Sequence, residues 1–125
     1  MWASAYFKYS EFDSPDLVGS GELMDFAFIG KLELVREKCG FPFIITSGYR
    51  TAEHNAAVGG KSNSAHLRGL AADVSVSDGP QRFKLVKAAL EVGFRRLEIG
   101  KLGPGREWVH CDLDPTLPQD TMFLV

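Results

Sequence analysis

The stretch that decides the fold is SAHLRGLAADVSV, residues 64–76. Its second half, residues 70–76, is rich in small and β-branched residues and predicts a strand. Asp73 lies inside this apolar run, and an uncompensated buried carboxylate is very costly in free energy. A metal ion would compensate its charge, and so would a buried basic partner such as Arg50. The segment alone leaves both possibilities open.

The flanking segments predict an α+β fold. Apolar residues recur at helical spacing along residues 22–39, and Gly40 ends that helix. Further helices are expected at residues 51–57 and 78–92, and strands at residues 43–46, 70–76, 95–100, 107–113 and 121–124. Because helices and strands do not alternate as regular βαβ units, we expect a small, mainly antiparallel sheet with helices packed on one face.

The length of 125 residues predicts a single domain over residues 1–125. Aromatic side chains in residues 1–18 indicate an N-terminal arm that packs on the core. The contents of 45% hydrophobic and 24% charged residues are ordinary for a globular protein. Cys39 and Cys111 do not make a disulfide framework, and we expect two buried free thiols.

Charge and hydropathy exclude several classes of partner. The net charge is −2 and no lysine or arginine run occurs, so we expect no nucleic acid and no membrane surface as partner. No apolar stretch approaches the roughly 20 residues that span a bilayer, and the N-terminus lacks the apolar core of a secretory signal. We therefore expect a monomer made in the cytoplasm, which reaches a substrate outside the membrane only after release by another factor.

A second segment, EWVHCD at residues 107–112, supplies a further metal-ligand candidate. Side chains alternate between the two faces of a strand, so His110 shares a face with Trp108 and Asp112, and Glu107 points the other way. Combined with His66 and Asp73, His110 makes a set of two imidazoles and one carboxylate. Three protein ligands leave one position of zinc open, which is typical of catalytic rather than structural sites.

These motifs resemble the signature of the zinc D-Ala-D-Ala carboxypeptidases and dipeptidases, peptidase family M15, which also contains phage L-alanyl-D-glutamate endolysins. The matching elements are S-x-H-x-x-G-x-A-x-D at residues 64–73, E-x-x-H at residues 107–110, and S-G-Y-R at residues 47–50. The resemblance covers roughly residues 43–112. It implies a fold similar to that of these peptidases and of the hedgehog signalling domains.

The resemblance also implies roles for individual residues. His66, Asp73 and His110 would be the ligands of Zn²⁺. Glu107 would be the general base that takes a proton from water and passes it to the leaving amine. Arg50 would stabilise the developing oxyanion or hold a substrate carboxylate, because its guanidinium stays charged and offers a planar fork of donors.

Other residues near these motifs have weaker assignments. We expect Ser64 to hydrogen-bond the substrate, and Tyr49 and Trp108 to form core or pocket wall with contact to the substrate. Asp112 is either a rival base or a residue that orients a ligand. Family spacing favours Glu107 as the base, although it reaches the metal only from a turn or a bulge.

Two residues receive a plainer interpretation. His54 is expected at the surface or behind the ligands, and not as a fourth ligand. Arg68 is expected to be a solvated loop charge.

The expected function is therefore a zinc metallopeptidase that hydrolyses peptidoglycan stem peptides, at either the D-Ala-D-Ala or the L-Ala-D-Glu bond, as a phage-type endolysin. The alternatives are a non-catalytic binding module, as in the hedgehog signalling domains, and a virion-associated protein that opens the wall. The presence of both Arg50 and Glu107 favours the enzyme, since a binding module has no need of the pair.

Overall fold

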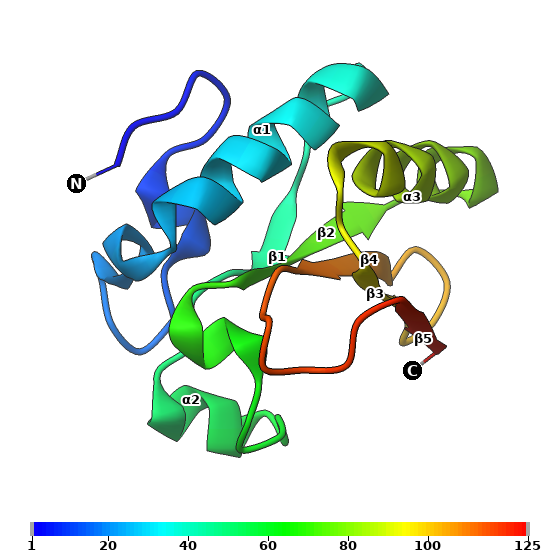
Figure 1. Cartoon of the computed structure of the whole chain (residues 1–125). Coiled ribbons are helices and arrows are strands. Elements are labelled where there is room, and N and C mark those ends of the chain that lie inside the picture. The colour runs from blue at the N-terminus through cyan, green and yellow to red at the C-terminus, as the bar shows by residue number, and fades with distance from the viewer. Residues whose placement is uncertain (1, 125) are drawn as a thin grey trace.

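The computed structural model describes residues 2–124 and contains one five-stranded sheet (Figure 1). The strand order is β1-β2-β4-β3-β5. The strands are β1 (Ile45–Ser47), β2 (Ala71–Val76), β3 (Arg96–Lys101), β4 (Glu107–Asp112) and β5 (Thr121–Leu124). All neighbouring pairs are antiparallel except β3 and β5, which are parallel. The prediction of a mainly antiparallel sheet is confirmed.

Two long helices, α1 (Phe26–Cys39) and α3 (Gly79–Val92), pack against each other over one face of the sheet (Figure 1). The short α2 (Ala52–Ala57) lies apart from them, beyond the end of β1. The predicted α+β arrangement, with helices on one face, is therefore confirmed. No helix in the described part of the chain has the length and apolar character needed to cross a membrane.

The first predicted helix begins later than expected. Asp25 caps α1 by accepting a hydrogen bond from the Phe28 N–H at 2.9 Å, so the helix starts after Asp25 and not at residue 22. The preceding residues form a separate 3-10 turn, Ser20–Leu23. Leu23 and Phe26, expected on the apolar face, are 58% and 70% exposed. The buried face of α1 begins only with the residues after them.

The core lies between the two helices and the inner face of the sheet. Alternate residues of the central strands, including Val74, Leu97 and Val109, are fully buried there. In the N-terminal segment, the rings of Trp2 and Phe7 pack edge-on against Phe12, with centroid distances of 5.7 and 5.5 Å. This packing leaves the opposite, outer face of the sheet free to carry polar side chains.

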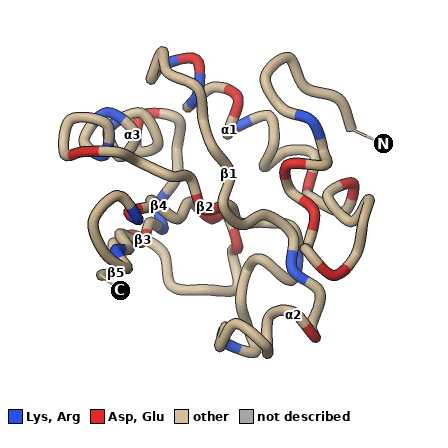
Figure 2. The backbone as a smooth tube through the Cα atoms, turned by 180° about the vertical axis from the view of Figure 1, so that it is seen from behind, with Lys and Arg blue, Asp and Glu red and all other residues tan. Residues whose placement is uncertain are grey.

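Acidic residues recur along the turns that precede α1 (Figure 2). Some of them fix the local backbone: the carboxylate of Asp13 accepts hydrogen bonds from the N–H groups of Gly19 and Gly21. Asp16 accepts a hydrogen bond from the Thr51 hydroxyl at 2.6 Å, which ties this segment to the start of α2. Cys39 and Cys111 are buried free thiols, as the sequence predicts.

Candidate metal centre

The outer face of the sheet collects polar side chains because the strands pair in a regular register. Asp73 on β2 lies opposite His110 on β4, and Glu98 on β3 lies opposite the same histidine. Residues directly opposite each other on neighbouring strands point to the same side of the sheet. The register alone therefore places three titratable side chains together.

His66 reaches this face from a 3-10 turn, η3 (Ala65–Arg68), that comes just before β2. The Ser64 hydroxyl accepts a hydrogen bond from the His66 N–H at 3.2 Å and so caps the turn. Gly69 ends the turn with a φ of 69°, and a Cβ at that position would lie 2.4 Å from the carbonyl oxygen of Leu23. The glycine of the motif is thus required by backbone geometry and close packing.

His66, Asp73 and His110 form one compact cluster, whose ligand atoms all lie within 4.8 Å of one another. Oδ1 of Asp73 lies 2.8 Å from Nδ1 of His110 and 3.5 Å from Nε2 of His66. The three residues that the sequence singles out as ligands are therefore together. Their donor set of two imidazole nitrogens and one carboxylate oxygen suits a divalent transition metal.

Each imidazole is oriented by a partner outside the cluster. Nδ1 of His66 donates to the carbonyl oxygen of Gly48 at 2.7 Å, which leaves Nε2 to face Asp73. Nε2 of His110 is 2.9 Å from Oδ2 of Asp112, which leaves Nδ1 to face Asp73. Proteins orient metal-binding histidines in this way, with the second ring nitrogen bonded to a carbonyl or carboxylate.

The charges and hydrogen bonds of the cluster's own members dominate its electrostatics. Burial raises the pKa of Asp73, but the charge on His66 and hydrogen bonds from both imidazoles outweigh it, so the pKa lies well below its ordinary value. Burial lowers the pKa of His110, but hydrogen bonds to Asp112 and Asp73 outweigh it and raise the pKa to about 9. The cluster thus holds a proton on His110 that a metal ion would displace.

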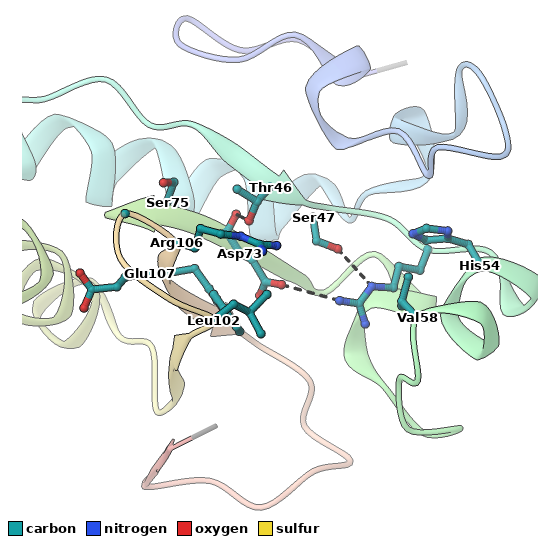
Figure 3. A pocket seen from close by; sticks show the side chains of 12 residues that line it. Thr46, Ser47, His54, Val58, Asp73, Ser75, Leu102, Arg106 and Glu107 are labelled. Carbon is teal, nitrogen blue, oxygen red and sulfur yellow. Dashed lines mark hydrogen bonds and ion pairs between the residues drawn. The ribbon is translucent and has the colours of Figure 1, made fainter. Parts of the chain in front are cut away.

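Arg50 lies beside the cluster and is held in place by two other residues. Its Nε donates to the Ser47 hydroxyl at 3.1 Å, and its Nη1 donates to Oδ1 of Asn55 at 3.3 Å. Its Nη2 lies 3.7 Å from Oδ2 of Asp73 (Figure 3), whereas both imidazoles face Oδ1. The two compensations expected for Asp73 are therefore compatible, because each uses a different oxygen.

The structure does not bring Glu107 into the cluster, and its role as the general base stays a prediction. Its carboxylate accepts a hydrogen bond from Nη1 of Arg82 on α3 at 2.9 Å. Figure 3 shows this carboxylate turned away from Asp73. Glu107 pairs with Val76 and Lys101 in an unbroken register, so β4 has no bulge that could turn it to the outer face.

Asp112 lies at the cluster, but its oxygens are already bonded. It is 1% exposed and accepts hydrogen bonds from Nε of Arg96 at 2.8 Å and from the Asp114 N–H at 3.0 Å. Together with the bond to His110, these contacts make Asp112 a residue that orients a ligand. The alternative role as base does not suit a carboxylate held by three donors.

Trp108 and Tyr49, both predicted to contact substrate, lie in different places. Trp108 is half-buried on the outer face and covers Gly100, where a Cβ would lie 2.0 Å from the indole ring. Tyr49 packs against the hydrophobic core, and its N–H donates to the carbonyl of Phe12 at 2.8 Å. Of the two, only Trp108 is placed to form a pocket wall.

Two adjoining hollows flank the cluster, with volumes of about 500 and 620 Å³. Arg50, Val58, Asp73 and Trp108 line both of them. The first extends toward the turn between β3 and β4 and is shown in Figure 3; besides the shared residues its lining includes Thr46, Ser47, His54, Leu102, Arg106 and Glu107. The second extends toward β5, and its lining includes Ser64, His66, Arg96, Glu98, His110, Asp112, Pro118 and Phe123.

Glu98 is a residue of this site that the sequence did not reveal. It is half-buried in the second hollow, and within residues 2–124 its carboxylate has no ion-pair or hydrogen-bond partner. The alternation of strand 95–100 puts Glu98 on one face with Arg96, but only the pairing of β3 with β4 brings that face to the metal ligands. His54, expected at the surface or behind the ligands, lies on α2 and lines the first hollow.

Comparisons with known proteins identify the family of this chain. A family model described as Peptidase M15 matches residues 5–112. The zinc D-Ala-D-Ala carboxypeptidase of Streptomyces albus G is 40% identical over 77 residues, which are 60% of this chain and 28% of the length of that protein. The crystal structure of the L-Ala D-Glu endopeptidase of Serratia marcescens matches with a TM-score of 0.49 and 21% identity, covering 74% of this chain and 82% of that chain. Because the family model spans most of the sequence, the chain belongs to the peptidase M15 family.

Proposed function

We propose that this chain is a zinc metallopeptidase that hydrolyses the stem peptides of bacterial peptidoglycan. The observation that carries the proposal is the cluster of His66, Asp73 and His110, which offers three ligand atoms between two hollows. Zinc bound by three protein ligands keeps a position open for catalysis. The relative from Streptomyces albus G supports the substrate class, since it is a zinc D-Ala-D-Ala carboxypeptidase.

Zinc would be held by Nε2 of His66, Oδ1 of Asp73 and Nδ1 of His110, the atoms that face one another. When bound, the ion supplies Lewis-acid polarisation of a carbonyl and a lowered pKa for water. The hydrogen bonds of His66 to Gly48 and of His110 to Asp112 hold both rings in the orientation that this coordination needs.

Arg50 would stabilise the oxyanion that develops as the scissile carbonyl is attacked. Its guanidinium remains charged at every relevant pH and lies within 3.7 Å of the Asp73 carboxylate, next to the cluster. The hydrogen bonds to Ser47 and Asn55 fix the guanidinium before substrate arrives. Donors that are oriented in advance stabilise developing charge more effectively than donors that must reorganise.

Glu98 would take the proton from the attacking water and deliver it to the leaving amine. It lies opposite His110 on the outer face, lines the same hollow as all three ligands, and its carboxylate has no other partner in the described part of the chain. Glu107, the base that the family spacing favours, forms an ion pair with Arg82 of α3. Residues in the two hollows, Trp108 among them, would bind the peptide on either side of the scissile bond.

Digestion of purified peptidoglycan, with and without a chelator, tests the proposal by mass spectrometry of the products. Chelator-sensitive release of D-Ala identifies a carboxypeptidase, and new L-Ala and D-Glu termini identify an endopeptidase. Absence of cleavage by a protein that demonstrably contains zinc would overturn the proposal in favour of a non-catalytic binding module.

The proposal extends to the biological setting. We infer a phage-type endolysin that is made in the cytoplasm and released by a separate membrane-disrupting protein. The inference is based on the sequence motifs, which resemble those of a family that includes such enzymes. All three ligands and both hollows come from one chain, which supports a monomer as the active form. Expression with and without a membrane-permeabilising partner tests the setting, since lysis should require both proteins; light scattering of the purified protein tests the monomer. Activity found only in an assembled virion would favour the wall-opening alternative.

A further inference from the structure

An ion pair between an exposed arginine, Arg68, and a buried aspartate, Asp114, lies outside the metal cluster. Arg68 is the last residue of η3, the turn that carries His66, and Asp114 follows β4, the strand that carries His110. The Asp114 side chain is fully buried, and Nε and Nη2 of Arg68 both contact its Oδ2. The expectation that Arg68 is a solvated loop charge holds in part: its side chain is 38% exposed, but its guanidinium pairs with Asp114, a buried residue 46 positions later in the sequence.

On its own side, Arg68 closes the loop that presents His66. Nη2 of Arg68 donates to the carbonyl oxygen of Asn63 at 2.8 Å, across the base of the η3 turn. The guanidinium thus joins both ends of the turn to Asp114. A planar fork of donors can bond two acceptors at once in this way, whereas a lysine ammonium has no such fixed geometry.

On the other side, Asp114 is connected to the second histidine. The Asp114 N–H donates to Oδ1 of Asp112 at 3.0 Å, and Oδ2 of Asp112 is 2.9 Å from Nε2 of His110. Oδ1 of Asp114 accepts hydrogen bonds from the N–H and hydroxyl of Thr116 at 2.9 and 2.6 Å. A continuous series of contacts therefore runs from the turn of His66 through Arg68, Asp114 and Asp112 to His110.

We propose that the Arg68–Asp114 pair is a positioning device that fixes the separation of the two histidine ligands. The inference rests on the proposed function, because it concerns the metal that this function requires. The same pair anchors the turn after β4, whose Leu117 and Pro118 line the second hollow. Arg68 and Asp114 touch none of the three ligand side chains, so they act on the metal only through the residues that they hold.

Removal of either partner should weaken zinc binding. Loss of an outer partner of a metal ligand typically costs about 10–100-fold in metal affinity, and we expect a loss in this range for Arg68→Met. The methionine side chain keeps part of the apolar stem and removes the guanidinium. Asp114→Asn is nearly isosteric and keeps an acceptor for Thr116, and we expect a similar loss from it. The double variant should lose little more than either single variant, because both changes break the same contact.

Arg95→Met provides the matched control. Arg95 and Asp120 also form an arginine–aspartate pair, but their side chains are 62% and 63% exposed and the pair does not connect to a ligand. The measurements are zinc affinity by competition with a chelating dye, the visible spectrum of the protein loaded with Co²⁺, and the Tm of the metal-free protein. The Tm separates a general loss of stability from an effect on the metal.

We expect Arg95→Met to keep the zinc affinity and cobalt spectrum of the unchanged chain, and both Arg68→Met and Asp114→Asn to lose affinity and alter the spectrum. If Arg68→Met does not fold, Asp114→Asn decides. Unchanged affinity and spectrum in a folded variant, with only a lower Tm, would overturn the positioning role and leave a structural one. Failure of the unchanged chain to bind zinc would instead overturn the proposed function.

Discussion

Replacement of Glu98 by glutamine tests which carboxylate handles the proton. Glutamine keeps the size and hydrogen-bonding capacity of Glu98 but cannot accept a proton at neutral pH. Removal of a general base typically lowers turnover by about 10²–10⁴-fold, which corresponds to about 2.7–5.4 kcal/mol of activation free energy. Zinc content should not change, because Glu98 is not among the three residues whose ligand atoms lie together.

Glu107→Gln is the matched comparison, because the carboxylate removed is the one favoured by spacing. Glu107 and Arg82 are 2.9 Å apart, with side chains 17% and 35% exposed. An ion pair that is partly open to solvent contributes at most about 1 kcal/mol, or about 3–5 °C in Tm for a domain of this size. We therefore expect a small loss of stability and turnover close to that of the unchanged chain.

The assay follows cleavage of a synthetic stem peptide by mass spectrometry, with zinc content and Tm measured on the same preparations. The inference from the structure predicts an inactive Glu98→Gln and an active Glu107→Gln, both loaded with zinc. The reverse pattern, an inactive, zinc-loaded Glu107→Gln beside an active Glu98→Gln, would refute the reasoning. It would mean that the start of β4 rearranges when substrate binds and that Glu107 leaves Arg82.

Three other predictions concern the metal centre. His66→Ala should abolish zinc binding and activity together, as measured by metal analysis and peptide cleavage, because only two of the three ligands remain. Chelation should lower the Tm, since a metal that binds only the folded state adds about 2.7 kcal/mol when its free concentration is 100 times Kd; an unchanged Tm together with full activity would contradict a zinc site. In the metal-free protein the pKa of His110 is raised from 6.5 to about 9. Its contribution to stability should therefore be complete below about pH 6.5 and disappear as the pH rises through about 9, which a pH series of melting curves on chelated protein checks.

The three candidate metal ligands could be singled out from the sequence because each carries a local signal. Asp73 is a charged residue in an apolar strand. His66 belongs to a turn that begins with a serine cap, Ser64, and ends at a glycine, Gly69, and both residues are present in the sequence motif. The alternation of strand 107–112 also identified the face of His110 correctly. These signals depend on neighbours within about ten residues, which the sequence displays directly.

Glu107 shows how two local rules can disagree. Spacing relative to His110 favoured it as the base, and strand alternation put it on the opposite face. Because the pairing of β4 with β2 and β3 is unbroken, strand alternation determines the face to which Glu107 points. A bulge would have reversed the outcome, and the sequence around Gly105 gave no means to tell a bulge from the turn that is present there.

Glu98 and Arg68 could not be found from the sequence, because their partners are set by tertiary structure. Glu98 joins the site because β3 lies beside β4. The order of strands in a sheet cannot be predicted from the sequence of a single strand. Arg68 meets Asp114 across 46 residues of chain. A charged residue in a loop has no local feature that reveals a distant partner, so the sequence indicates the exposure of Arg68 but not its ion pair.

The environment of Asp73 also explains why the two compensations expected for it need not exclude each other. Its Oδ1 faces the two imidazoles, and its Oδ2 faces Arg50 at 3.7 Å. Charge balance by Arg50 alone does not account for the two imidazoles that face the other oxygen. The second ring nitrogen of each imidazole is bonded to a partner outside the cluster, Gly48 or Asp112. The carboxylate thus lies between the guanidinium of Arg50 and a site where a metal ion would displace the proton that His110 holds. A fixed cation beside a metal-polarised carbonyl would stabilise the oxyanion that develops in peptide hydrolysis.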